Sequence, residues 1–121
     1  MRINGDFSAT TVSEVSDIRL KRDIQPINDA LGSILKLEGR TFKWRTDEYS
    51  EQGFGEGLAL GLIAQEVESV LPELVQEDRD GYKAIEYGKL MAVLVQGVKE
   101  QQTQLEALRD RIAQLELRKG S

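Results

Sequence analysis

The sequence predicts an α+β fold, in which a small domain of mixed helices and strands is followed by a long C-terminal helix that forms a coiled coil. Two observations predict this fold. Short apolar segments alternate with turn signals through the first two thirds of the chain, and a 4-3 apolar repeat fills the last third. With 121 residues and 40% hydrophobic content, the chain can bury one modest core, so we expect a single domain.

The first half of the chain predicts one helix and one strand. Pro26 suits the first turn of a helix, and the apolar spacing that follows predicts a helix from about Pro26 to Lys36. In "RTFKWRTD", Phe42 and Trp44 alternate with cationic residues as a half-buried strand requires, and we expect both aromatic side chains to lie in the core. The glycine-rich "SEQGFGEG" predicts a loop or hairpin tip.

The next segments predict two further strands and a helix. "LALGLIAQEVESVLPEL" begins as a strand around Leu58 to Ile63 and passes into a helix that Pro72 stops. "EDRDGYKAIEY" contains a turn at Asp80-Gly81 and a strand through Tyr82 to Glu86.

The remainder of the chain, from about Tyr87 to Leu117, predicts one continuous helix with Gly97 as its weak point. Its 4-3 repeat indicates a coiled coil, and Arg111 at position g can pair with Glu116 at position e of a parallel chain. The alternative is a helix packed on its own domain, but the polar remainder leaves a stripe too narrow for that. The repeat does not decide between a coiled coil of two helices and one of three. The expected core residues are Met91, Val98, Leu105 and Ile112 at a, with Leu94, Gln101, Leu108 and Leu115 at d.

Composition argues against several kinds of site and partner. The chain has no histidine and no cysteine, which removes thiolate chemistry and the usual general base, and we expect neither a metal nor a cofactor. A net charge of −5 argues against a nucleic-acid partner, because phosphate binding needs a clustered cationic face. No apolar run approaches the length of a membrane span, so no membrane partner is expected.

The stretch "VSDIRLKRDI", residues 15 to 24, concentrates one serine, two acids and three cations ahead of the first expected helix. Without histidine, a serine nucleophile needs another base, and a neutral lysine can serve. Ser16 and Lys21 are the candidates. Residues five apart in a continuous helix are rotated by about 140° and do not meet, so this pair requires a turn or irregular backbone. The alternative interpretation is an Asp or Ser helix cap within a solvated charge cluster.

Four motifs occur in order ahead of the heptads: "SDIRLKRDI", "FKW", "GLIAQEVESVLPELV" and "YKAIEYGKLMAVLVQGVKE". Together they resemble the C-terminal intramolecular chaperone domain of phage tailspikes and tail fibres, an endosialidase-type family also found in the myelin regulatory factor. The resemblance covers roughly residues 16 to 116. It implies a homotrimer that assembles the preceding fibre or tailspike segment of the same chain and then cuts itself off immediately before the motif serine.

Carried onto this chain, the resemblance implies a self-cleaving serine endopeptidase. Ser16 is then the nucleophile, Lys21 the base, and the scissile bond joins Val15 to Ser16. Asp17 and Arg19 also match the motif, and we expect them to support the site rather than to take part in the chemistry.

The resemblance also implies three segments and a location. Residues 1–15 are expected to end the preceding fibre or stalk, residues 16–86 to form the chaperone and autoprotease region, and residues 87–117 to form a parallel trimeric coiled coil. The expected location is the virion tail fibre or tailspike, with the chaperone part released in the host cytoplasm after assembly. Two other functions remain open: a structural trimerisation tip that does not cleave, and a receptor-binding tip that uses the loop around Gly53 to Gly57.

Overall fold

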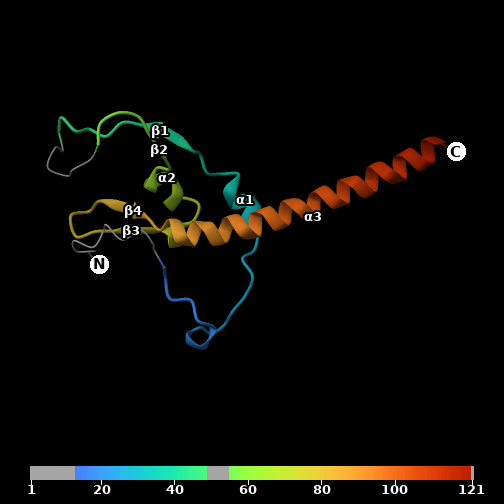
Figure 1. Ribbon diagram of the computed structural model, residues 1–121, viewed down its shortest axis with the longest axis horizontal. Helices are drawn as coiled ribbons and strands as arrows, with labels where there is room; N and C mark the ends of the chain where they lie inside the picture. The colour runs from blue at the N-terminus through green and yellow to red at the C-terminus, as the bar shows by residue number, and fades with distance from the viewer. Residues whose placement is uncertain (1–12, 49–54, 121) are drawn as a thin grey trace.

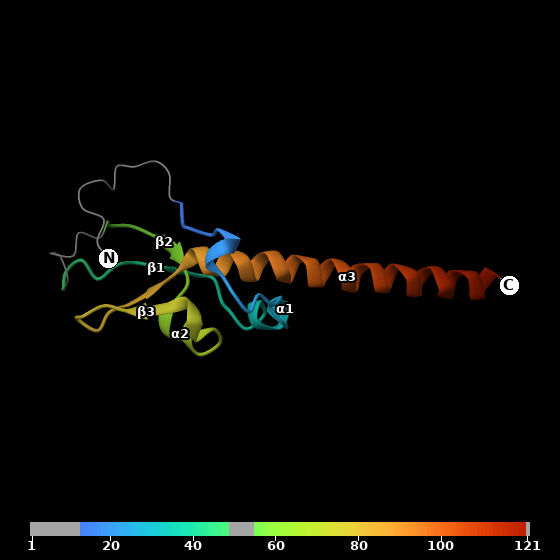
Figure 2. The ribbon, with the colours of Figure 1, turned by 90° about the horizontal axis from the view of Figure 1, so that it is seen from below.

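The computed structural model describes residues 13–48 and 55–120 (Figure 1). Within these ranges, two small sheets and short helices gather around one end of a long C-terminal helix, whose other end projects away from them (Figures 1 and 2). This arrangement confirms the α+β class. Most of the expected stalk segment, up to residue 12, and residues 49–54 of the glycine-rich loop lie outside the described residues.

Both sheets are two-stranded and antiparallel. Thr41 lies opposite Leu60 in the first sheet, and Gln76 lies opposite Ala84 in the second. The elements, in chain order, are η2 (Ile18–Leu20), α1 (Ala30–Ile34), β1 (Arg40–Phe42), β2 (Ala59–Gly61), α2 (Ala64–Glu68), η4 (Pro72–Leu74), β3 (Val75–Glu77), β4 (Lys83–Ile85) and α3 (Tyr87–Gly120).

The β3–β4 hairpin turns where the sequence predicts. Gly81 has a φ of 87°, in the left-handed region that glycine adopts without steric cost. Asp78 stabilises the turn, because its Oδ1 accepts hydrogen bonds of 2.9 Å from the backbone N–H groups of Asp80 and Tyr82.

The core lies where α2, η4 and the first turn of α3 meet. Val67, Leu74 and Leu90 are its buried members. The backbone N–H of Glu86 donates to the carbonyl of Leu74 over 2.7 Å, which fixes the start of α3 against this core. The partly buried side chains that surround the core are those of Leu37, Leu62, Leu71, Val75 and Ile85.

Helix α1 packs across α3 at Gly97, where a Cβ would collide with Cδ1 of Ile34. Glu100, one turn further along α3, accepts hydrogen bonds from the backbone N–H groups of Ala30 at 3.0 Å and Leu31 at 2.9 Å. These N–H groups belong to the first turn of α1, where a helix has no acceptors of its own. The expected weak point at Gly97 is therefore a packing site.

The expectation of a helix from Pro26 to Lys36 is wrong at its start. Helix α1 spans only Ala30–Ile34, because Asp29 adopts a left-handed φ of 53° that a continuing helix excludes. Residues 25–27 instead face α3 across a shallow groove.

Two further local expectations are wrong. Helix α2 ends at Glu68, and Pro72 does not stop it but opens η4, as a proline at a first helical position does. Phe42 and Trp44 pack edge to face with ring centroids 5.1 Å apart, yet Trp44 is 43% exposed and neither ring joins the core. Strand β1 ends at Phe42, so Trp44 lies beyond it, and among the described strands β1 pairs only with β2.

Helix α3 carries two different stripes over its first half. Leu90, Val93 and Gly97 are buried against the rest of the chain. The heptad positions that begin at Met91 lie on another face and stay exposed, as they do through Leu115. No helix in the described part of the chain is both long and apolar enough to cross a membrane.

Candidate functional site

Ser16 and Lys21 lie in contact, since Nζ of Lys21 donates to Oγ of Ser16 over 2.7 Å. The single 3₁₀ turn η2 brings them together. Its N–H groups at Leu20 and Lys21 donate to the carbonyls of Asp17 and Ile18 at 3.0 and 3.1 Å. Asp17 and Lys21 on either side are extended, with ψ of 132° and 153°. This is the irregular backbone that a pair five residues apart requires.

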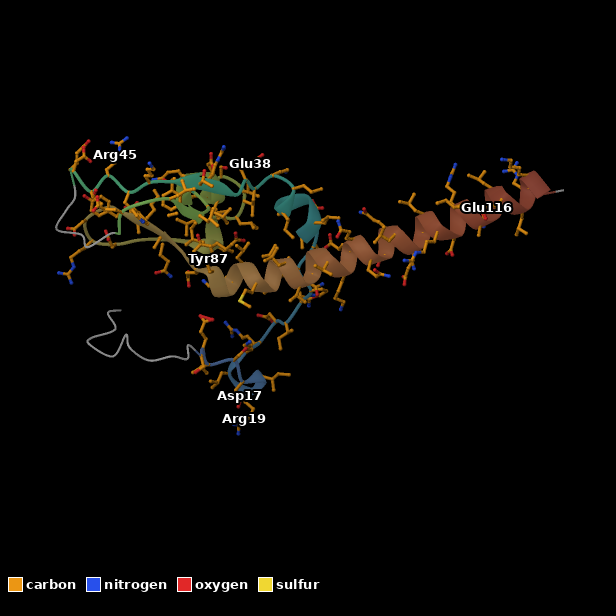
Figure 3. All side chains as sticks on the ribbon, turned by 45° about the horizontal axis from the view of Figure 1, so that its top comes forward. Asp17, Arg19, Glu38, Arg45, Tyr87 and Glu116 are labelled. Carbon is orange, nitrogen blue, oxygen red and sulfur yellow. The ribbon has the colours of Figure 1, made fainter. Side chains whose placement is uncertain are left out.

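Asp17 and Arg19 hold this turn. Oδ1 of Asp17 accepts the Arg19 backbone N–H at 2.9 Å, and Oδ2 accepts Nη2 of Arg19 at 2.8 Å. The side-chain hydrogen bond from Arg19, and then the one from its backbone, lower the pKa of Asp17 below its ordinary value. Figure 3 shows both residues on the segment that stands apart from the sheets. Asp17 is thus a cap, as in the alternative interpretation, and it caps the turn that joins Ser16 to Lys21.

The surface around this turn is apolar and open in the single chain. The turn itself presents no buried side chain. The exposed fractions are 82% for Val15, 71% for Ile18, 75% for Leu20 and 59% for Ile24. Exposed apolar side chains gathered around the turn that carries Ser16 and Lys21 are typical of a surface that another molecule covers.

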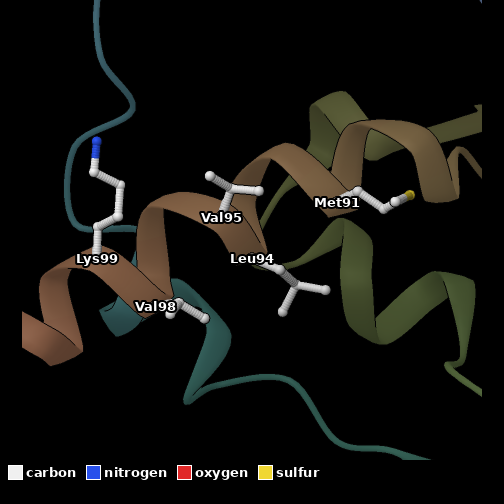
Figure 4. A pocket seen from close by; sticks show the side chains of 5 residues that line it. All are labelled: Met91, Leu94, Val95, Val98 and Lys99. Atoms are coloured by element: carbon white, nitrogen blue, oxygen red, sulfur yellow. The ribbon is translucent and has the colours of Figure 1, made fainter.

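A second apolar surface lies on α3. Met91, Leu94 and Val98 line a groove on the helix together with Val95 and Lys99 (Figure 4). Val95 and Lys99 also line the groove between α3 and residues 25–27. The segment that follows the Ser16–Lys21 turn therefore lies next to the heptad face.

The described residues contain no group of three or more acidic side chains placed to hold a metal ion. Sequence reasoning missed Glu100 and the packing role of Gly97. No local signal marks Glu100, because its hydrogen-bond partners are backbone groups 69 and 70 residues away in the sequence.

The molecule is therefore a small α+β unit joined to a projecting helix, with a serine–lysine pair on an exposed turn at its amino end. The family model described as "chaperone of endosialidase" matches residues 16–76. The chain belongs to this family, and the match begins at Ser16.

Curated relatives include phage long tail fibre proteins named Gp37. The protein of Escherichia phage AR1 is 39% identical over 85 residues, which cover 66% of this chain. The protein of Enterobacteria phage K3 is 32% identical over 121 residues, which cover 90% of this chain. The protein of Salmonella phage S16 is 38% identical over 72 residues, or 58% of this chain. The matches span only 8 to 9% of the length of these relatives.

Proposed function

We propose that this chain is a C-terminal intramolecular chaperone that trimerises, assembles the phage tail fibre or tailspike preceding it, and then releases itself by cutting between Val15 and Ser16. The observation that carries the proposal is the 2.7 Å contact between Ser16 and Lys21 at the residue where the family match begins. The tail fibre relatives support the fibre as the partner and the virion tail as the location.

The proposed chemistry is one internal cleavage per chain. The neutral amine of Lys21 takes the hydroxyl proton of Ser16, and Oγ attacks the carbonyl carbon of Val15. The proton passes to the amide nitrogen of Ser16 as the C–N bond breaks, which leaves an ester between Val15 and Oγ of Ser16. Water hydrolyses this ester, giving a carboxylate on Val15 and a free amino group on Ser16. Because the nucleophile follows the scissile carbonyl directly, proximity supplies much of the rate.

The exposed heptad face of α3 supports a parallel trimeric coiled coil as the oligomerisation element. The apolar residues at a and d remain 43 to 65% exposed along the helix, whereas Leu90, Val93 and Gly97 already pack within the chain. Two neighbouring copies would cover the a and d residues without disturbing the packing of α1. Residues 1–15, 16–86 and 87–117 would then serve as the end of the fibre, the cleaving region and the trimerisation helix.

Assembly also offers a physical switch for cleavage. In the single chain the turn that carries Ser16 and Lys21 is open to water, which favours the charged form of a lysine. Burial disfavours that charge, so a neighbouring copy that covered Val15, Ile18 and Leu20 would favour the neutral amine. Cleavage would then follow correct assembly.

Intact mass spectrometry of the purified protein tests the proposal. We expect loss of the segment up to Val15 and a new N-terminus at Ser16, with Ser16→Ala as the uncleaved control. An oligomer that keeps its full mass over days at neutral pH would instead support a structural tip that does not cleave.

A further inference from the structure

The side chain of Glu14, two residues before Ser16, contacts the amino end of α3. Glu14 lies with its carboxylate against Gly88, the second residue of that helix. A Cβ at Gly88 would lie 2.6 Å from Oε1 of Glu14 and 3.3 Å from its Cδ. Real Cβ atoms do not approach other atoms to 2.6 Å, so a side chain at position 88 would displace the carboxylate.

Electrostatics favours this contact. The N–H groups of Lys89 and Leu90 already donate to the carbonyl of Glu86, and the helix dipole places positive charge at this end of α3. Helix α3 is 34 residues long, and its first turn contains no acidic residue of its own. Lys89 in that turn forms an ion pair with Glu86, with Nζ 3.1 Å from Oε1. Glu14 therefore brings a carboxylate to this helix end from a distant part of the sequence.

The chain returns to the same face of α3 after the turn. Gly88, Ala92 and Lys99 are four and seven residues apart, which places them on one side of the helix. Ala92 and Lys99 face residues 25–27 across their groove. The chain thus contacts α3 at Glu14, loops away through the Ser16–Lys21 turn and comes back to α3 (Figure 1).

We propose that Glu14 is a positioning residue for self-cleavage. This inference rests on the function proposed above. By docking at Gly88, Glu14 fixes the backbone one residue before Val15, and so holds the Val15 carbonyl where Oγ of Ser16 attacks it. With the chain held on both sides of the turn, the reacting atoms keep one geometry, which is the source of the proximity effect. Glu14 acts through the backbone and exchanges no proton in the reaction.

A double-mutant cycle on the oligomer tests this role. Glu14→Ala and Gly88→Ala should each slow the appearance of the Ser16 N-terminus by about ten- to a hundredfold, the scale of a small misplacement of reacting groups. The double variant should be no slower than the slower single variant, because both changes remove one contact. Ser13→Ala and Gly120→Ala are the matched controls, since a Cβ at Gly120 meets nothing within 4 Å. Cleavage at the normal rate in either single variant, or multiplied losses in the double variant, would overturn the inference.

Two further readouts separate this inference from the proposed function. The dependence of the rate on pH should keep its shape in Glu14→Ala and change only in height, whereas a changed shape would contradict a purely positioning role. In the uncleavable Ser16→Ala oligomer, the Gly88 amide should shift in NMR spectra when Glu14 is changed to Gln. If the unaltered oligomer cleaves but Gly88 does not respond, the docking of Glu14 is wrong and the proposed cleavage stands. If the unaltered oligomer does not cleave, the proposed function fails, and the positioning role fails with it.

Discussion

One exposed carboxylate holds the turn that joins Ser16 to Lys21. Asp17 accepts the Arg19 backbone N–H and pairs with its guanidinium, so the turn does not depend on a buried core. Such a cap orders a short turn that would otherwise interconvert with extended conformations. The chemistry proposed for Ser16 therefore depends on a neighbour that takes no part in the reaction.

We predict that Asp17→Ala slows cleavage by roughly two- to tenfold, because the cap is lost while the Ser16 and Lys21 side chains remain. Asp17→Asn should be milder, since its amide oxygen still accepts the Arg19 N–H. The rate is measured by gel after refolding from denaturant, with sedimentation to verify the trimer. Equal rates in Asp17→Ala and the unaltered protein would show that the cap is not needed.

The lowered pKa of Asp17 sets the pH range of this support. A carboxyl group whose pKa is lower in the folded state contributes stability above its unfolded pKa, and loses it as pH falls through the folded pKa. The capped turn should therefore persist at mildly acidic pH.

At the scale of elements, α3 serves the fold and, in the proposed function, also the assembly. The buried face of α3 anchors α1 through Gly97 and Glu100. The exposed stripe begins at Met91, the residue after Leu90, and lies on another face of the helix. A short helix such as α1 is marginal alone, so it depends on this anchorage. Any change in α3 that moves Glu100 should therefore also move α1.

We predict that Glu100→Ala lowers the free energy of unfolding by about 1–3 kcal/mol, because two N–H groups at the start of α1 lose their acceptor. Glu106→Ala on the same helix is the control, since Oε2 of Glu106 accepts a long, exposed hydrogen bond of 3.4 Å from Nε2 of Gln102. Denaturant unfolding followed by circular dichroism measures both. An effect of Glu100→Ala as small as that of Glu106→Ala would contradict the capping role.

Local sequence patterns predicted the elements that local chemistry determines. The turn at Gly81 and the start of α3 at Tyr87 follow from turn residues and apolar spacing. The start of α1 could not be predicted from such local patterns. It depends on the left-handed backbone of Asp29 and on Glu100, which contacts α1 only in the folded chain. Composition and spacing made Ser16 and Lys21 candidates and required an irregular backbone between them, and the family resemblance favoured them over the alternative of a helix cap. The structure contains that irregular backbone as the turn η2.

At the scale of the whole molecule, the single chain has little core for its size. Among the described residues, only Ala30, Val67, Leu74, Leu90 and Val93 are buried apolar side chains. Apolar residues instead cover two exposed regions, the heptad face and the turn around Ser16. Uncovered apolar surface of this extent is what the proposed trimer would bury.

We predict that Leu108→Asp combined with Ile112→Asp abolishes assembly, because charges at a and d positions would be buried without partners. Cleavage should be lost too, although both residues lie far from Ser16 in sequence. Ala113→Asp with Gln114→Asp adds the same charge outside the a and d positions and should leave trimer and cleavage intact. Light scattering and mass spectrometry measure the two properties. A demonstrated monomer that cleaves at the normal rate would contradict the coupling of cleavage to assembly.

The most direct test of the account is the intact mass of assembled Lys21→Arg beside the unaltered protein and Lys21→Met. Arginine keeps the charge and most of the stem that a structural lysine provides, but its guanidinium does not give up a proton near neutral pH and cannot act as the base. The unaltered trimer should lose the segment up to Val15, and both variants should form trimers of full-length chains. Normal processing in Lys21→Arg, or a new N-terminus anywhere other than Ser16, would contradict the assignment of Ser16 and Lys21 as the cleaving pair.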